Sequence, residues 1–453
     1  MRATSLGHAT WLIEAGGARL LTDPVLRDPF EQGAVTSCPS RTLSLERLPE
    51  VDALFLSHRH LDHYDFVSLD RFSRELPLFC PDDPLLHGGL RAMGFRDLRV
   101  LTPFEPVDWR GARLTATPSQ AKLPEVGLLI QDDSGALYNQ VDTLLGPREV
   151  KRIREITALD VHLAMYASQD FAVFESARQD VAQLHAANLN VALSLGARLV
   201  VPASGGFRFA DRFDWLNAHV FPISRELFAA DLARLAQTRT AQMDPGDVVT
   251  IDGEVTVAAQ AADFVARGDE GTERFAYDPT APIPALTESE VDPALEGWVD
   301  ALLERLPAFI GDAGRAGDPV VHEYFRRGVT YRLEAVLPAR TRAITYSFEP
   351  SGRCRILEGD PAPEPQVRHR FVASALRDLF EGRISCFVYR CSSRRSSRVL
   401  EVTTSPQGAR VTEHTPSDLL THAVVNLKAA DRGRDAAFLE YYGLVPPPEL
   451  CRS

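Results

Sequence analysis

Three histidines and an aspartate lie within one hexapeptide, His58-Arg59-His60-Leu61-Asp62-His63. The apolar stretch 51–57 before them has the length and composition of a strand. His58 and His60 alternate along an extended segment and therefore point the same way, while Asp62 and His63 follow after the chain turns. Unpartnered burial of these groups would be costly, so a metal site is favoured over a solvated histidine-rich loop. Nitrogen and oxygen donors of this kind suit zinc, iron or manganese rather than calcium.

The pattern His-x-His-x-Asp-His after a buried strand resembles the hallmark of the metallo-β-lactamase superfamily. Upstream, 7–13 and 20–24 look like the opening strands of its lactonase-like and phosphodiesterase-like branches. Downstream, 136–143 is similar to the strand that supplies the bridging aspartate of the family, which implies that Asp142 lies between two metal ions. The resemblance covers residues 1–265 and implies a four-layer αββα sandwich in the α/β class.

Two histidines that the family normally has are missing. The region 117–120 contains none, and Gln120 or Glu125 is the candidate replacement. The late loop reads Val-Pro-Ala-Ser-Gly-Gly over 201–206, so Ala203 or Ser204 stands where an imidazole is expected. Ser204 and Arg208 are the candidates there for a further ligand or a substrate contact.

The resemblance implies two divalent metal ions, zinc or iron, with manganese as a further candidate. One ion would have His58, His60 and Asp142 as ligands, and the other would have Asp62, His63 and Asp142. Asp62 and Asp142 would also take part in catalysis. His8 and Asp23 are expected behind the ligands, where a carboxylate can hold a ligand imidazole in its correct tautomer.

Three functions follow from this site. The first is a hydrolase that acts on an ester, lactone, amide or phosphodiester through a metal-activated water. The second is a non-heme iron oxygenase, because two histidines and a carboxylate with open positions suit iron and because 202–217 is similar to the branch that contains CMP-N-acetylneuraminate hydroxylase. This chain has no Cys-x-His pair for a Rieske cluster, so the electron donor would be a separate protein. The third is a binding or scaffold protein that has lost catalysis and binds metal weakly.

Composition narrows the class of protein. The 453 residues suffice for two or three domains, and a net charge of −13 argues against an electrostatic footprint for nucleic acid or anionic membranes. No apolar run approaches the roughly 20 residues of a membrane span, and the first residues lack the apolar core of a signal peptide. The six cysteines show no C-x-x-C spacing, which is typical of reduced thiols in a cytoplasmic protein. We therefore expect a cytoplasmic enzyme with a small-molecule substrate.

A linker is expected over 266–289, where Gly, Pro and charge are frequent, and an α+β domain over 290–453. In the first domain we expect a helix over 181–195, ended by Gly196, before the strand 199–201. The second domain is predicted to contain helices over 295–306 and 371–382 and strands near 330–336, 342–348 and 384–390. This pattern resembles sterol-carrier-protein-2 modules, which implies an apolar ligand or a homodimer. The remaining predicted strands are 10–14, 19–22, 52–57, 99–101, 113–117, 126–131 and 136–140.

Overall fold

The computed structural model describes residues 1–174, 180–268, 276–359, 364–406 and 408–446. They divide into two compact units, of which the first comprises 1–170 and 180–281 and the second comprises 171–174 and the residues from 282 onward. The predicted domain ranges 1–265, 266–289 and 290–453 stay a prediction. Residues 269–275 of that linker lie outside the described residues.

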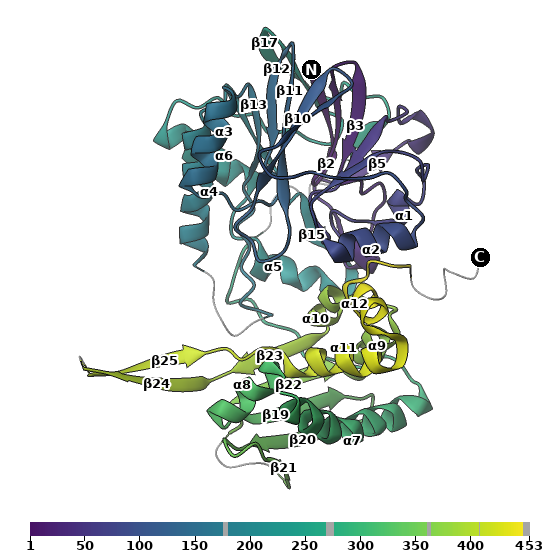
Figure 1. Cartoon of the computed structure of the whole chain (residues 1–453), viewed down its shortest axis with the longest axis vertical. Helices are drawn as coiled ribbons and strands as arrows, with labels where there is room; N and C mark the ends of the chain where they lie inside the picture. Colours follow the sequence, from purple (N-terminus) through teal and green to yellow (C-terminus); the bar gives the residue numbers. More distant parts are fainter. Residues whose placement is uncertain (175–179, 269–275, 360–363, 407, 447–453) are drawn as a thin grey trace. The chain divides into compact units, whose positions relative to one another are not determined.

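Two sheets form the centre of the first unit (Figure 1). The eight-stranded sheet has the order β17 (Glu254–Ala258), β16 (Val248–Asp252), β1 (Arg2–Gly7), β2 (Thr10–Ala15), β3 (Ala18–Thr22), β6 (Ala53–Phe55), β7 (Leu78–Cys80) and β8 (Leu98–Val100). The six-stranded sheet has the order β14 (Leu199–Ala203), β13 (Val161–Met165), β12 (Gly135–Asn139), β11 (Val126–Asp132), β10 (Ala112–Pro118) and β9 (Pro106–Trp109). β6, which precedes the histidine motif, and β12, which precedes Asp142, are both interior strands of their sheets.

The alternation of side chains along the strands explains why these sheets stack. Leu128 and Ile130 of β11 point into the core between the two sheets, whereas Leu129 points to the outer face. That outer face is covered by α3 (Pro147–Ile156), α4 (Val181–Leu195) and α6 (Arg225–Leu235). The helices α1 (Phe66–Leu69) and α2 (Pro84–Ala92) lie beside the eight-stranded sheet (Figure 1). The α/β sandwich predicted for the first part of the chain is confirmed.

Short elements connect these layers around the site. β4 (Val35–Ser37) pairs with β15 (Phe207–Phe209), and β5 (Arg41–Leu43) pairs with β18 (Val265–Arg267). The single-turn elements are η1 (Glu31–Gly33), η2 (Leu45–Arg47), η3 (Asp211–Leu216) and α5 (Asn217–Val220). The pairing of β4 with β15 joins the loop after β3 to the loop after β14.

The second unit is a five-stranded sheet with helices packed on one face. Its order is β21 (Cys354–Leu357), β20 (Thr341–Phe348), β19 (Thr330–Val336), β22 (Val367–Val372) and β23 (Ser393–Ser397). Its helices are α7 (Pro293–Arg315), α8 (Pro319–Arg327), α9 (Ala373–Glu381), α10 (Cys386–Cys391), α11 (Leu419–Arg432) and α12 (Arg434–Tyr442). Apolar residues of β19, α7 and α11 share one core. The unit thus has the helices and strands of the predicted α+β class, and its likeness to sterol-carrier-protein-2 stays a prediction.

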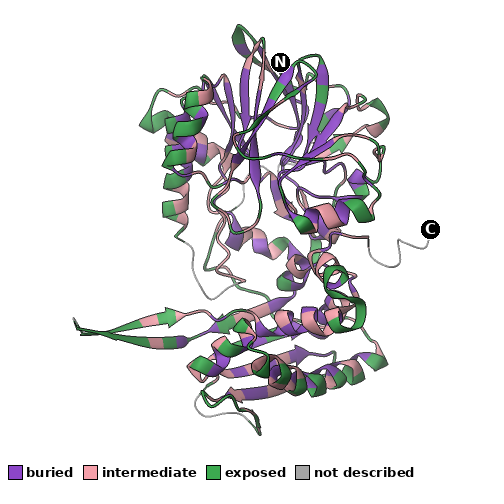
Figure 2. Cartoon of the chain, in the orientation of Figure 1, coloured by how far each residue is buried: buried purple, intermediate pink, exposed green. Residues whose placement is uncertain are grey.

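A two-stranded ribbon was not predicted. It consists of β24 (Val399–Ser405) and β25 (Gly408–His414), and Figure 2 shows it largely exposed. Even its apolar residues Leu400, Val402 and Val411 are exposed. A ribbon that buries neither face does not need the alternating apolar pattern that usually predicts a strand.

Two of the predicted elements need correction. The predicted strand 384–390 is wrong, because this segment forms α10, and the Ser385 side chain accepts a hydrogen bond from the Val388 amide as the N-cap. A short apolar run such as this one does not distinguish a strand from a helix. The predicted helix 371–382 begins later, at Ala373, because Phe371 and Val372 pair with β19 as the end of β22. Its end is as predicted, with Gly382 in the left-handed conformation.

Among the described residues, no helix combines the length and the apolar character that crossing a membrane requires. Five of the cysteines are free thiols, and Cys451 lies outside the described residues.

Candidate metal centre

The histidine motif follows β6 directly, and the chain turns at His60. The amides of His63 and Tyr64 both donate to the His60 carbonyl, which closes a tight turn. The turn brings Asp62 and His63 back towards His58, as the spacing predicted. His58 and His63 have fully buried side chains, so their ring nitrogens depend on partners inside the protein.

The ligand atoms of the motif converge on Asp142. His63 Nε2 lies 3.2 Å from Asp142 Oδ2 and 3.5 Å from Asp62 Oδ2. His58 Nε2 lies 4.0 Å from Asp142 Oδ2 and 2.9 Å from His60 Nδ1. The His58 and His60 nitrogens are close enough to donate to one shared cation, and His58 also faces the Asp142 carboxylate.

Asp142 comes from the other sheet. β12 ends at Asn139, and Val141 has a φ of +54°, which turns the chain so that Asp142 faces the motif. The Asp142 side chain is 31% exposed, and His60 is also exposed, in contrast to the buried imidazoles of His58 and His63. The site therefore opens to solvent on the Asp142 side, which is where a substrate could enter.

Asp23 supports the His63 ring from behind. Its buried carboxylate accepts hydrogen bonds from the Ser57 amide (2.7 Å) and the Ser57 hydroxyl (2.8 Å), and it lies 3.0 Å from His63 Nδ1. A proton on Nδ1 leaves the Nε2 lone pair directed at Asp62 and Asp142. This is the contact that the predicted role of Asp23 requires.

His8 lies closer to the cluster than predicted. Its Nε2 is 3.2 Å from Asp62 Oδ2, and its ring meets the His63 ring edge to face at 5.1 Å. The sequence interpretation placed His8 behind the ligands, whereas the structure places it among the groups that face the cluster. The ligand atoms of His8, Asp62 and His63 all lie within 4.8 Å of one another, and those of His58, His63 and Asp142 form a second such group.

The other candidates have different positions. Glu125 is buried, and its Oε1 has no hydrogen-bond partner, while Asp142 is one of the charges that act on it. Gln120 does not join the cluster, because its amide donates to Glu149 at the start of α3. Ser204 is buried with a φ of +60°, and Arg208 lies half-buried on β15. A ligand or substrate role for these residues stays a prediction.

Sequence reasoning missed Glu31. Its side chain is 6% exposed, and the charges of Asp62 and His63 act on it. It sits on η1 with a φ of +47°, which is unusual for a residue other than glycine. Burial and Asp62 raise the pKa of Glu31 well above its usual value. No local spacing in the loop 24–40 connects Glu31 with the motif, so the sequence carried no signal for it.

In the metal-free protein the charges of the cluster favour a protonated His63 between the ionised Asp62 and Asp142, beside neutral His58 and His60. Burial opposes the charge on His63, but Asp62 and Asp142 outweigh it and raise the pKa of His63 well above its usual value. Burial, with His63 and His60, holds the pKa of His58 well below its usual value, and burial also lowers the pKa of His60. Burial alone would raise the pKa of Asp62 and of Asp142, but His63 outweighs it and both values lie below the usual range. Burial raises the pKa of Glu125 to about 7, with Asp142 adding to the effect.

These residues fit a bound metal ion. Among the buried side-chain atoms without a hydrogen-bond partner are Nε2 of His8, Nε2 of His63 and Oε1 of Glu125. A bound water or ion is one common explanation for buried polar atoms that lack partners. The donor set is nitrogen and carboxylate oxygen, which divalent zinc, iron and manganese accept.

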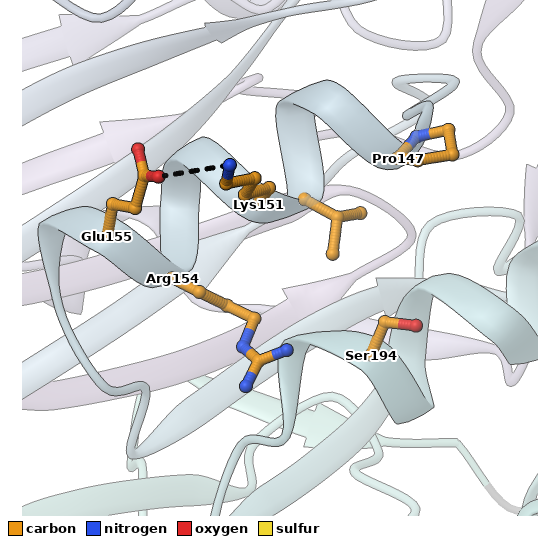
Figure 3. Close-up of a pocket in the computed structure, with 6 residues that line it drawn as sticks. Pro147, Lys151, Arg154, Glu155 and Ser194 are labelled. Atoms are coloured by element: carbon orange, nitrogen blue, oxygen red, sulfur yellow. Dashed lines mark ion pairs between the residues drawn. The ribbon is translucent and has the colours of Figure 1, made fainter.

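A separate cavity lies between α3 and α4. It has a volume of about 450 Å³ and is lined by Pro147, Val150, Lys151, Arg154, Glu155 of α3 and Ser194 of α4. Figure 3 shows Lys151 paired with Glu155 at its edge, 3.8 Å apart. None of its lining residues belongs to the cluster.

Comparisons with known proteins agree with the fold of the first unit. Residues 2–140 match the beta-lactamase superfamily domain. A Mycolicibacterium smegmatis protein named as a Rieske 2Fe-2S iron–sulfur protein is 27% identical over 179 residues, which are 37% of this chain and 34% of that protein. A metal-dependent hydrolase of Pyrobaculum aerophilum is 26% identical over 275 residues, which are 55% of this chain and 100% of that protein.

Among solved structures, CmlA, a diiron beta-hydroxylase from Streptomyces venezuelae, is similar with a TM-score of 0.36 and 19% identity over 45% of each chain. This chain spans about a third of the length of its Rieske-named relative in Mycolicibacterium smegmatis and about half of those in Mycobacterium tuberculosis. The superfamily match over 2–140, the two stacked sheets and the His-x-His-x-Asp-His motif at the end of β6 agree with one another. The N-terminal part of this chain is a metallo-β-lactamase superfamily domain.

Proposed function

We propose that the chain is a metal-dependent hydrolase that adds water across an ester, lactone, amide or phosphodiester bond. The observation that carries the proposal is that His58 and His63 face Asp142, with His60 beside His58 and Asp62 beside His63. Two bound divalent ions would supply a water with a pKa lowered to about 7 and would polarise the substrate oxygen. The Pyrobaculum relative, named as a metal-dependent hydrolase and matched over its whole length, supports the same chemistry.

The chain's own residues would orient the reaction. Asp62 would accept a hydrogen bond from the attacking water, because its carboxylate lies between His8 and His63 at the edge of the cluster. Asp142 would hold the two halves of the site together, and its 31% exposure leaves an approach for the substrate. Asp23 would keep His63 in the tautomer whose Nε2 faces the site.

Asp62→Asn tests this function. The full chain is loaded with zinc, manganese or iron and offered a p-nitrophenyl ester, a homoserine lactone and bis-p-nitrophenyl phosphate. We expect turnover of at least one substrate class, reduced about 10²–10⁴-fold by Asp62→Asn. The control is Asp231→Asn, since Asp231 pairs with His185 on the helices that cover the six-stranded sheet. No turnover of any class with any metal would contradict the proposal.

A second candidate function is a non-heme iron oxygenase. Glu125 favours it, because a buried carboxylate near Asp142 makes the site richer in carboxylate than a histidine would. Relatives named as Rieske iron–sulfur proteins also favour it. Hydroxylation of a C–H or N–H group would consume dioxygen, two electrons and two protons and release water, so a separate electron-transfer protein would be the partner. Two iron ions per chain, with a near-ultraviolet charge-transfer band, would support this candidate over the hydrolase.

The C-terminal unit would serve either chemistry as an accessory domain. We propose, from its sterol-carrier-like pattern, that it binds an apolar ligand or pairs two chains. Its helices contribute Leu302, Leu306 and Leu376 to an apolar core. The alternative is that this core only stabilises the fold of the unit. Size-exclusion chromatography with light scattering distinguishes a dimer from a single chain.

A further inference from the structure

We propose that His8 is a metal ligand and replaces the imidazole that the loop at Ala203 and Ser204 lacks. The proposal rests on the proposed function only in requiring that the cluster binds metal. It assigns the second ion the ligands His8, Asp62 and His63, with Asp142 shared. His58 and His60 are then left for the first ion.

The distances around His8 are those of ligands on one ion. His8 Nε2 lies 3.2 Å from Asp62 Oδ2, and Asp62 Oδ2 lies 3.5 Å from His63 Nε2. Donor atoms bound at about 2.0–2.1 Å in a tetrahedron are about 3.3–3.4 Å apart. One ion can therefore satisfy all three side chains with little movement.

Asp62 is the carboxylate that faces the buried His8 ring. The His8 side chain is 1% exposed, and neither ring nitrogen has a hydrogen bond of acceptable geometry, although Asp62 is close. His63 Nε2 is in the same condition. Burying both imidazoles in this way costs free energy that a bound cation would offset.

The backbone presents His8 to the site at a cost. His8 lies in the turn between β1 and β2 with a φ of +48°, and Gly7 before it has a φ of +102°. A non-glycine residue in this region typically costs on the order of 1–3 kcal/mol and persists where the surroundings or the function require it. Phe30 and Phe207 pack against the imidazole and fix its direction.

The late loop leaves room for His8. A Cβ at Gly206 would lie 3.1 Å from His8 Cα and 3.2 Å from the Cys38 carbonyl, so a side chain there would displace His8. His8 and Ser204 also line the same cavity of about 20 Å³. Ser204, which stands where the family has an imidazole, therefore lies near His8, which would supply one.

The test measures cobalt binding by the full chain, because the visible absorption of Co²⁺ reports the number and kind of its ligands. We expect two ions per wild-type chain, and one ion, or a second ion weakened more than about tenfold, for His8→Ala and His8→Gln. His8→Gln separates the roles, since glutamine keeps hydrogen bonding but not the imidazole. His185→Ala on α4, which removes a histidine paired with Asp231, is the control and should bind two ions.

A rescue variant keeps the test independent of folding. Adding Ser204→His to His8→Ala returns an imidazole to the family position, and we expect it to restore the second ion. Two ions with unchanged absorption in His8→Ala would overturn the proposal while leaving the hydrolase intact. Two ions in the wild type and one in His8→Ala, without turnover of any substrate, would support His8 and contradict the hydrolase. A wild-type chain that binds no cobalt would overturn both.

Discussion

Asp23→Asn would reverse the polarity of the contacts that one oxygen of Asp23 makes behind the metal ligands. One oxygen of Asp23 accepts from the Ser57 amide, and the other accepts from the Ser57 hydroxyl and lies 3.0 Å from His63 Nδ1. Asparagine can keep the first oxygen, but its NH₂ group then faces His63. His63 must accept at Nδ1 and carry its proton on Nε2, which removes the lone pair that faces Asp62 and Asp142.

The size of the effect follows from the role of such supporting carboxylates. Their loss typically lowers metal affinity about 10–100-fold, which corresponds to about 1.4–2.8 kcal/mol. Metal-free stability should also fall, because the hydrogen bonds to a buried charged acceptor are each worth about 1.5–3 kcal/mol and Asp23 is fully buried. The two losses are measured separately, by isothermal titration with zinc and by urea unfolding of the metal-free protein.

Asp65→Asn is the matched control. Asp65 is also a buried carboxylate, but it pairs with Arg27 at 2.9 Å and caps α1 through the Ser68 amide. Its substitution should lower stability and leave zinc affinity unchanged. Zinc affinity of Asp23→Asn within twofold of the wild type would refute the reasoning about the His63 tautomer.

Three further predictions concern the surroundings of the site. Glu125 has a pKa of about 7 in the folded protein against 4.5 in the unfolded chain, so the folded protein binds this proton more tightly. The free energy of unfolding of the metal-free protein should therefore fall by on the order of 3 kcal/mol as pH rises from about 4.5 to about 7. Glu125→Gln should remove that part of the pH dependence, and urea unfolding at pH 5 and pH 8 checks it; an unchanged slope would contradict the burial of an uncompensated acid. Gly206→Ala should lower the free energy of unfolding by about 1–3 kcal/mol and weaken binding of the second metal ion, because its Cβ would lie 3.1 Å from His8 Cα. The control Gly297→Ala on α7, which has open space around it, should be neutral or stabilising. Equal effects of the two substitutions would count against the close approach of Gly206 to His8. Arg41 has a fully buried side chain that pairs with Asp28 at 2.8 Å and donates to the carbonyls of Leu6 and Val25. Because an ammonium cannot reach these acceptors together, Arg41→Lys should lower the free energy of unfolding by about 2 kcal/mol, measured by urea unfolding. A loss below about 0.5 kcal/mol would show that the network contributes little.

The parts of the site that could be predicted are those encoded by local spacing. His58, His60, Asp62 and His63 lie in one turn after one strand, so their convergence follows from strand alternation and a turn. Asp142 was found through the family resemblance, since no local pattern connects it with the motif 80 residues earlier. Its contact with His63 depends on the stacking of two sheets.

His8 and Glu31 show what sequence reasoning cannot reach. His8 approaches Asp62 because of the left-handed turn at Gly7 and His8 and the absence of a side chain at Gly206, which are contacts between separate loops. Glu31 lies on a loop whose path is set by the pairing of β4 with β15. Neither contact leaves a periodic signal along the chain.

The fold shows the same division. The long alternating strands of the first unit and the helix 181–195 with its Gly196 cap were predicted, because periodicity and capping are local. The segment 384–390 was predicted as a strand, but a short run of mostly apolar residues fits a helix equally well. Only the Ser385 cap, which the structure reveals, decides for the helix.

Metal stoichiometry tests the central claim most directly. The full chain and His60→Ala/Asp142→Ala are prepared identically, dialysed, and analysed by inductively coupled plasma mass spectrometry, with circular dichroism to confirm that both fold. We expect two metal ions per chain in the wild type and an empty site in the double variant. A double variant that folds and keeps its metal would contradict the ligand assignment on which the account depends.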